Sequence, residues 1–396
     1  MKRLPLCLLP AATLALLTVA PAPAADPPPR NQAHVEYAQT LWDFLNRPGA
    51  NYRSWTPTET VLVMPYGPAA DANSKTYQNR VASESPSLPV GSIIVTEHLH
   101  GEDVVGVSVW YRQADGYDAA NGDWYWAYFT PQGKLAQASG DNSPYAKRGF
   151  VTVEEDGRLW VLKIGTPELA DFFKDGELAK HVVRPGAGPG GRTIKAPDAE
   201  TIDEYLTAKS GFVTLIEDGR LWVFHESSEE LADFTSQGEL AKHVIRPGAG
   251  PGGMTIKAPD AETLDEYLLA KPGFMTKVED GRLWVIALGS EEEAAFKKDG
   301  ELAKHVIQPA AGPNGMTIKA PDAETIAKYM ASAEGFHVVL EDGRVWVFKS
   351  GSPEYTQFKQ DGEPAKSVTR PGAGPRGVTL RAVDAETLDA YQRAVN

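Results

Sequence analysis

The segment "EHLHGED", which begins at Glu97, holds the residues best suited to bind a metal ion. If this segment is a strand, His98 and His100 project from the same face, about 7 Å apart, and Glu102 or Asp103 adds an oxygen ligand. Two histidines still fall short of the three protein ligands that are typical of catalytic zinc. Two interpretations therefore stay open, a metal site at His98 and His100 or a pair of ordinary surface imidazoles.

Three recurrent motifs look chemical but occur in the wrong setting. "GAGPGG" at Gly186 matches the dinucleotide-binding fingerprint, which needs a helix after it. A strand follows instead, and the third copy reads "AAGPNG", so we interpret the motif as a hairpin loop. "EDGR" recurs four times in solvated turns, where a carboxyl group lacks the desolvation that acid–base catalysis needs. One histidine per copy (His181, His243 and His305, with Ser367 in the fourth) makes a metal site only if the copies curl into a ring.

These motifs belong to an internal repeat that fills the second half of the chain. "GFVTVEEDGRLWV" at Gly149 returns in similar form at Gly211, Gly273 and Gly335, each time after 62 residues, and the last copy ends at Asn396. Self-similarity at a fixed period is the main sequence sign of a repeat architecture. The short connections, such as "AKS" and "AKP", favour stacked neighbours over independent units on flexible linkers.

Within one copy the apolar pattern predicts the order ββαββα. Asp218-Gly219 between two apolar runs predicts a tight hairpin, and "SSEELADF" predicts a serine-capped helix with Leu231 and Phe234 on one side. "AKHVIRP" and "MTIKA" form a second strand pair, and Asp260 caps a second helix. We therefore expect a four-stranded antiparallel sheet with two helices on one face.

The alignment of the two halves of a copy assigns the faces of this sheet. Leu221 and Val223 match apolar positions in the second half and should point at the helices, which leaves Trp222 on the opposite, helix-free face. This face either packs on the next repeat or forms an aromatic platform for a ligand. The residues concerned are Trp160, Trp222, Trp284 and Trp346.

Charge and composition exclude several classes of function. The chain has 396 residues and a formal net charge of −14. This acidic balance argues against binding to nucleic acid and against electrostatic binding of a polybasic segment to anionic lipid. No stretch after the N-terminal segment is long and apolar enough to span a bilayer. The partner is therefore an unknown protein or a small-molecule ligand.

The N-terminus resembles a signal peptide. Lys2 and Arg3 precede an apolar run, and Ala22-Pro23-Ala24 supplies small residues at the cleavage spacing. The only cysteine, Cys7, lies early in that run, away from the position that a bacterial lipoprotein needs. We expect cleavage after Ala24 and a periplasmic or secreted protein without cysteine, which excludes disulfides and thioether-linked haem.

The region from Tyr52 to Gly140 resembles the cytochrome P-460 family of exported mono-haem c-type cytochromes. The matching stretches are "YRSW", "KTYQN", "PVGSIIVTEHL" and "VSVWYRQADGYDAANGDWYWAYFTPQGKLAQASG". The resemblance implies a compact, antiparallel-β-dominated domain with a helix at its start. "VEYAQTLWDFL" fits that helix, with an apolar stripe at Val35, Ala38, Leu41 and Leu45.

The chain departs from the family where the family carries its chemistry. "DNSPYAKRG" stands where the resemblance places a C-x-x-C-H haem-attachment motif, and Thr96 stands where some members have a haem-linking lysine. Trp110 stands where many members have methionine. We therefore expect no covalent haem and no cofactor, and we expect Trp110 and neighbouring rings to fill part of the space of the macrocycle.

The sequence thus predicts an α+β protein with no catalytic residue. Its expected parts are a signal peptide (1–24), a cytochrome P-460-like domain (25–148) and repeats at 149–210, 211–272, 273–334 and 335–396. A non-catalytic binding or scaffold protein is the favoured function. The alternative is a redox or metal-binding protein that uses non-covalent haem or a metal at His98 and His100.

Overall fold

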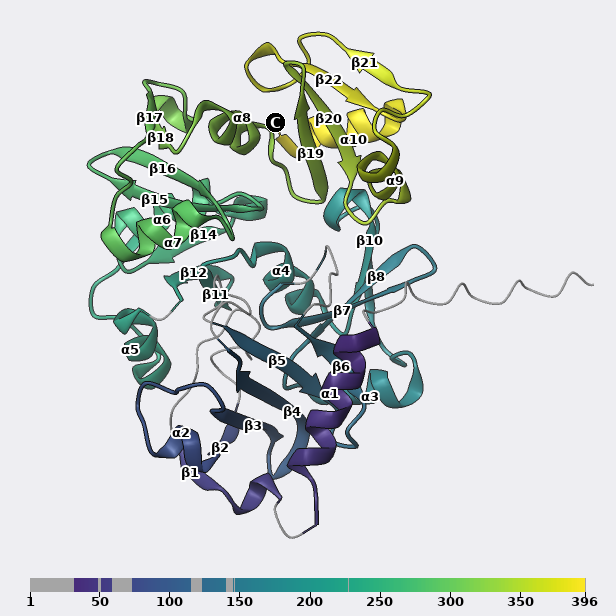
Figure 1. Cartoon of the computed structure of the whole chain (residues 1–396), viewed down its shortest axis with the longest axis vertical. Coiled ribbons are helices and arrows are strands. Elements are labelled where there is room, and N and C mark those ends of the chain that lie inside the picture. Colours follow the sequence, from purple (N-terminus) through teal and green to yellow (C-terminus); the bar gives the residue numbers. More distant parts are fainter. Residues whose placement is uncertain are drawn as a thin grey trace, which may run out of the picture.

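The computed structural model describes residues 32–48, 51–58, 73–114, 123–139, 145, 147–226 and 228–395. The expected signal peptide and most of "DNSPYAKRG" lie outside these residues. The described part is an α+β protein with one six-stranded sheet followed by four similar four-stranded units (Figure 1).

The first domain is an antiparallel meander whose strands pair in chain order, β1-β2-β3-β4-β5-β6. It is built from α1 (Gln32–Leu45), η1 (Tyr52–Ser54), β1 (Thr56–Thr58), β2 (Ser74–Gln78), α2 (Arg80–Ser83), β3 (Ile93–His100), β4 (Asp103–Arg112), β5 (Trp124–Phe129) and β6 (Leu135–Ala138).

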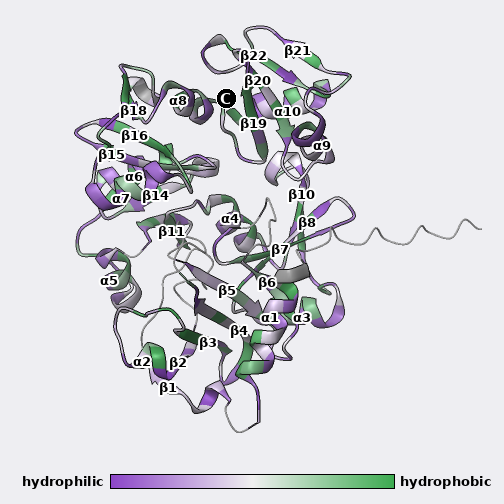
Figure 2. Ribbon diagram, viewed as in Figure 1, coloured by the Kyte–Doolittle hydropathy of each residue, from purple (hydrophilic) through white to green (hydrophobic). Residues whose placement is uncertain are grey.

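Helix α1 covers one face of this sheet. Ala38, Leu41 and Leu45 are buried against β3, β4 and β5, as the apolar stripe predicts, whereas Val35 is only half-buried. Figure 2 shows both hydrophobic and hydrophilic residues along α1, which fits a helix with one face on a core and one in solvent. The other face of the sheet needs a different cover.

Each repeat has the predicted order ββαββα, with a short 3-10 turn before its fourth strand. Repeat 1 consists of β7 (Phe150–Glu155), β8 (Arg158–Lys163), α3 (Pro167–Asp175), β9 (Val182–Arg184), η3 (Pro189–Gly191), β10 (Thr193–Ala196) and α4 (Ala199–Thr207). Repeat 2 consists of β11 (Phe212–Glu217), β12 (Arg220–His225), α5 (Glu229–Gln237), β13 (Val244–Arg246), η4 (Pro251–Gly253), β14 (Thr255–Ala258) and α6 (Ala261–Leu269).

The last two repeats follow the same plan. Repeat 3 consists of β15 (Phe274–Glu279), β16 (Arg282–Ala287), α7 (Glu291–Asp299), β17 (Val306–Gln308), η5 (Pro313–Gly315), β18 (Thr317–Ala320) and α8 (Ala323–Ala331). Repeat 4 consists of β19 (Phe336–Glu341), β20 (Arg344–Lys349), α9 (Pro353–Asp361), β21 (Val368–Arg370), η6 (Pro375–Gly377), β22 (Thr379–Ala382) and α10 (Ala385–Val395).

The local signals for turns and helix caps are confirmed. Asp218 and Gly219 both have positive φ, as a tight hairpin requires. The side chains of Ser228 and Asp260 accept hydrogen bonds from backbone N–H groups in the first turns of α5 and α6. "GAGPGG" lies in the loop between the antiparallel strands β9 and β10, also as predicted.

The prediction of a purely antiparallel sheet is wrong. The strand order in repeat 2 is β11-β12-β14-β13, and the two central strands, β12 and β14, are parallel. Helix α5 and strand β13 carry the chain back before β14 begins, so β14 runs in the direction of β12. The two outer pairs are antiparallel.

The prediction that both helices lie on one face is also wrong. Leu221 and Val223 pack with α6, as predicted, but Trp222 and Phe224 pack with α5 on the opposite face. Sequence alternation assigned the side chains to the correct faces, but the second face is not free of a helix. Each repeat therefore buries both faces of its sheet under its own helices.

The repeats contact their neighbours through a regular hydrogen bond. A buried tyrosine in the second helix of each repeat donates its hydroxyl to a backbone carbonyl just before that repeat, which in repeats 2 to 4 is the last residue of the previous repeat's second helix. The second helices of repeats 1 to 3 also contact the first strand of the next repeat. The bonds are Tyr205 to Tyr145 (2.8 Å), Tyr267 to Thr207 (2.8 Å), Tyr329 to Leu269 (2.7 Å) and Tyr391 to Ala331 (2.6 Å).

The four repeats close into a ring, because repeat 4 returns to repeat 1 (Figure 1). Next to this contact, the Tyr145 hydroxyl, just before repeat 1, donates to the Ser350 carbonyl of repeat 4 at 2.6 Å. Lys147, also just before repeat 1, pairs with Glu334 at the start of repeat 4 at 3.2 Å. A Cβ at Gly335 would lie 1.9 Å from the backbone nitrogen of Gly190, so this closure needs glycine.

Candidate functional site

The face of the six-stranded sheet opposite α1 carries a cluster of neutral polar and aromatic side chains. We call it the polar face and define it by Thr96 and His98 on β3, Ser108 and Trp110 on β4, and Tyr128 on β5. Cross-strand register places Thr96 opposite Ser108, and Ser108 opposite Tyr128. All five side chains are buried, so this is an interior polar surface and not a solvated one.

His98 is the polar group at the centre of this face. Its side chain is 0% exposed, and Nε2 lies 2.7 Å from Oγ of Ser108. Its Nδ1 is buried with no hydrogen-bond partner. Burial lowers the pKa of His98 to about 4. The imidazole is therefore neutral near pH 7, and one of its ring nitrogens lacks a hydrogen-bond partner.

Tyr128 limits the space beside His98. The two rings lie 5.6 Å apart, and a Cβ at Gly106 would lie 1.8 Å from the Tyr128 hydroxyl. Only glycine leaves room for the hydroxyl at that point of β4. The hydroxyl accepts a hydrogen bond from the Gly165 N–H at 3.3 Å, and burial raises the Tyr128 pKa far above its usual value.

Repeat 1 covers the polar face. Trp110 and Tyr128 belong to the same buried cluster as Trp160 and Phe172 of repeat 1. At the edge of this contact, Nζ of Lys134 donates to the Phe173 carbonyl at 3.1 Å. The second face of the first domain is thus closed by the first helix region of the ring.

Trp110 is 1% exposed and packs in this cluster with Trp126 and Tyr128. Its indole Nε1 is buried without a hydrogen-bond partner, and leaving such a donor unpaired costs about 1–3 kcal/mol. The structure thus places Trp110 among neighbouring rings, as expected. The polar face combines this unpaired donor with the unpaired nitrogen of His98.

The two histidines of the candidate metal site lie in different environments. The pairing of β3 with β4 shifts register between His98 and Leu99, and Val105 of β4 is the residue left unpaired there. His98 is buried and His100 is exposed. Within the described residues, no group of three or more His, Cys, Asp or Glu side chains could hold a metal ion.

Sequence reasoning missed a buried ionic cluster around Glu97, on the face that α1 covers. Glu97 accepts hydrogen bonds from the Tyr52 hydroxyl (2.8 Å), Arg53 Nε (2.6 Å) and the Tyr77 hydroxyl (3.4 Å). Burial and the Glu97 charge raise the pKa of both tyrosines. Every oxygen of this carboxylate has a partner, which is typical of a structural ion pair. The residues that could have indicated this cluster are Tyr52 and Arg53 in "YRSW" and Glu97 in "VTEHL".

The four periodic tryptophans are interior residues and form no exposed platform. Their side chains are at most 1% exposed. Trp222 lies 4.8 Å from Phe234 of its own helix α5, with Lys257 4.3 Å above the ring. They also do not need the next repeat as a cover, which corrects that part of the prediction.

The recurring histidines serve the same packing. Although the repeats do form a ring, His243 lies against Trp222 at 4.9 Å, and His181 and His305 lie against the tryptophans of their own repeats. Each histidine also places Nδ1 near a backbone carbonyl of its own repeat. They do not converge on a common site.

Lysines lie where the repeats join. Nζ of Lys209 donates to the carbonyls of Tyr267 (2.8 Å) and Ala270 (3.2 Å) at the end of α6, and Lys271 bonds in the same way to Met330. Burial lowers the pKa of Lys209 to about 8, while the Glu334 charge opposes this shift. These ammonium groups satisfy helix carbonyls, so we interpret them as structural.

Comparison with protein-family models, curated proteins and solved structures finds no match to this chain. Among the described residues, no helix has the length and apolar character that crossing a membrane requires. The geometry of the polar face is therefore the main basis for a functional proposal.

Proposed function

We propose that this protein is an exported, non-catalytic binding protein, in which a haem-less cytochrome P-460-like domain is joined to a ring-shaped scaffold of four repeats. One observation carries the proposal. His98 Nδ1 and Trp110 Nε1 are buried on the polar face without hydrogen-bond partners, and buried polar groups are nearly always paired with protein, water or a ligand.

The polar face favours a small uncharged ligand. Its members Thr96, His98, Ser108, Trp110 and Tyr128 are neutral, because the pKa of His98 is low and that of Tyr128 is high. A charged ligand would be desolvated there without a counter-charge. The ligand class is a molecule with a hydrogen-bond donor and an acceptor, such as a small amide.

The residues do not fit a covalently attached haem. No cysteine follows Cys7, and Thr96, at the position of the family's cross-linking lysine, lies on the polar face with its hydroxyl 3.0 Å from that of Thr76. Trp110 and repeat 1 occupy the space above that face. We propose that the protein works without a cofactor.

Acetamide titration tests the binding proposal. We expect acetamide to shift the Trp110 indole N–H resonance of the purified mature protein saturably. His98→Phe should abolish the shift, and His100→Phe, the matched control at an exposed position, should retain it. No saturable shift in the parent protein, or an equal shift in both variants, would contradict the proposal.

The alternative function, a metal or non-covalent haem bound at His98, has its own test. Metal analysis and an absorption spectrum of the same preparation should show neither stoichiometric metal nor a haem band. A metal or haem that His98→Gln removes and His100→Gln retains would support the alternative instead.

Export is a separate part of the proposal. The charged start, the apolar run and the small residues before Asp26 support cleavage after Ala24. The intact mass of the protein recovered from the periplasm or medium should lack residues 1–24. A mature protein that retains Met1 would exclude this processing.

A further inference from the structure

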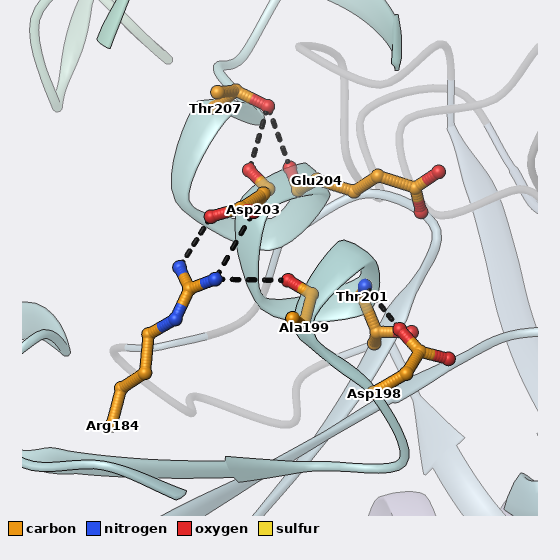
Figure 3. Close-up of polar contacts among 7 residues, drawn as sticks. All are labelled: Arg184, Asp198, Ala199, Thr201, Asp203, Glu204 and Thr207. Atoms are coloured by element: carbon orange, nitrogen blue, oxygen red, sulfur yellow. Dashed lines mark hydrogen bonds and ion pairs between the residues drawn. The ribbon is translucent and has the colours of Figure 1, made fainter. Parts of the chain in front are cut away.

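Three of the four repeats share an ion pair that repeat 3 lacks, and a pocket lies beside the position of the missing pair. In repeat 1, Arg184 forms a bidentate ion pair with Asp203 of α4, and it also donates to the Ala199 carbonyl (Figure 3). Equivalent pairs occur in repeat 2 (Arg246 with Asp265) and in repeat 4 (Arg370 with Asp389). Each pair links the third strand of a repeat to its second helix.

Repeat 3 lacks both partners of this ion pair. Gln308 stands in place of the arginine and Ala327 in place of the aspartate. Loss of a single partner would leave a lone charge, whereas loss of both leaves a neutral site. Ala327 also has a much shorter side chain than aspartate, which removes volume from the junction between repeats 3 and 4.

A pocket of about 220 Å³ lies at this junction, between α8 of repeat 3 and β19, β20 and η6 of repeat 4. We call it the junction pocket. Its walls are mostly apolar and include Ile326, Met330, Leu340, Val345 and Val378. Gln308, Ala327 and Arg376 also line it. A dry cavity of about 150 Å³ already holds benzene, so this volume admits one ring or a short alkyl chain.

Repeat 4 contributes a positive charge to the junction pocket. Arg376 stands where repeats 1 and 2 have glycine, and it keeps a left-handed backbone with φ +57°. This conformation is costly for a residue with a side chain. Its Nη1 donates to Oε1 of Gln308 at 2.8 Å, and it forms no ion pair with any described residue.

We propose that the junction pocket binds a small amphipathic monocarboxylate, with its apolar part against Ile326 and Met330 and its carboxylate on Arg376. Guanidinium groups bind carboxylates by paired, charge-assisted hydrogen bonds. The ligand anion thus supplies the negative charge that Asp203 and Asp265 supply in repeats 1 and 2. Gln308 orients the guanidinium without neutralising it. The site is independent of the polar face of the first domain.

The test uses octanoate and benzoate, with octanol and benzyl alcohol as uncharged analogues, titrated into the full mature protein by calorimetry. We expect one site per chain for a carboxylate. The affinity should fall about tenfold or more when the alcohol replaces the acid, since a hydrogen bond to a charged group is lost.

Three variants locate the site. Arg376→Gly restores the residue of repeats 1 and 2 and relieves the backbone strain, so it should fold and lose about tenfold or more in carboxylate affinity. Ala327→Leu should fill the pocket and abolish binding. Arg344→Gln removes the same charge from the exposed first residue of strand β20 in the same repeat and should leave binding unchanged. Unfolding curves of each variant verify folding.

Several results would overturn the proposal. These are no binding by the parent protein, equal affinity for acids and alcohols, or unchanged affinity in Arg376→Gly together with Ala327→Leu. Binding of a peptide with a free apolar C-terminus, under conditions in which octanoate and benzoate do not bind, would also overturn it and assign the pocket to a protein partner.

Discussion

The six-stranded sheet of the first domain and the four-stranded sheets of the ring differ in how their second faces are covered. Each repeat covers both faces of its sheet with its own two helices. The first domain has α1 on one face and depends on repeat 1 for the other. Buried polar atoms without partners, such as His98 Nδ1, occur at this borrowed cover. The first domain thus depends on a neighbouring unit to bury the face that carries the candidate site, whereas the repeats bury both faces of their own sheets.

The largest expected effect tests whether the tryptophans are covered within their own repeats. Trp222→Ala should lower the free energy of unfolding by about 3–5 kcal/mol, as for other buried aromatic residues. Trp346→Ala in the terminal repeat should cost a similar amount, because Phe358 of its own helix α9 covers the ring at 5.5 Å. Urea denaturation measures both. A much smaller cost at Trp346 would show that the cover comes from neighbouring repeats.

The second prediction concerns the acid pH dependence of stability, which we assign to His98, buried between the first domain and repeat 1. Its pKa is about 4 in the folded protein and 6.5 when it is unperturbed, so the unfolded chain binds more protons between these values. The free energy of unfolding should therefore fall by about 3 kcal/mol as pH drops from 6.5 to 4. His98→Gln should remove this component and His100→Gln should retain it. Equal acid sensitivity in both variants would exclude His98 as the cause.

The third prediction concerns the alkaline pH dependence of stability, which we assign to Lys209 in the ring. Lys209 has a pKa of about 8 in the folded protein against 10.5 when it is unperturbed, so stability should rise as pH increases from 8 to 10. The rise should be about 2 kcal/mol, and Lys209→Met should flatten it. Denaturation at pH 8, 9 and 10 measures the slope. An unchanged slope in the variant would mean that the ammonium group is well solvated.

The smallest effect tests the regular bond inside the ring. Tyr267→Phe removes the 2.8 Å hydrogen bond to the Thr207 carbonyl and should cost about 1 kcal/mol. Tyr329→Phe, which removes the equivalent bond to Leu269, serves as the matched comparison. Thermal unfolding of both variants should give shifts of similar size. A large difference would show that the junctions are not equivalent in strength.

The sequence alone determined the features that depend on neighbouring residues. The period of 62, the hairpin at Asp218-Gly219 and the cap at Asp260 follow from local backbone and hydrogen-bonding preferences. Alternation also assigned Leu221 and Trp222 to opposite faces, because side chains alternate strictly along a strand. These signals need no knowledge of distant contacts.

The sequence itself contains evidence against the predicted helix-free face. The run Leu221 to Phe224 is apolar at every position, a pattern of strands buried on both faces. It argues against a helix-free face on the tryptophan side. Likewise, Leu231 and Phe234 of α5 form an apolar stripe that needs a partner, and Trp222 is that partner.

Tertiary structure alone decided which residues meet across the chain. The packing of repeat 1 on the sheet buries His98 but leaves His100 exposed, and the closure of the ring brings Tyr145 to Ser350 across 205 positions. The junction pocket joins α8 to η6 in the same way. Such contacts depend on how whole elements pack, because the same local pattern fits several arrangements of helices around a sheet.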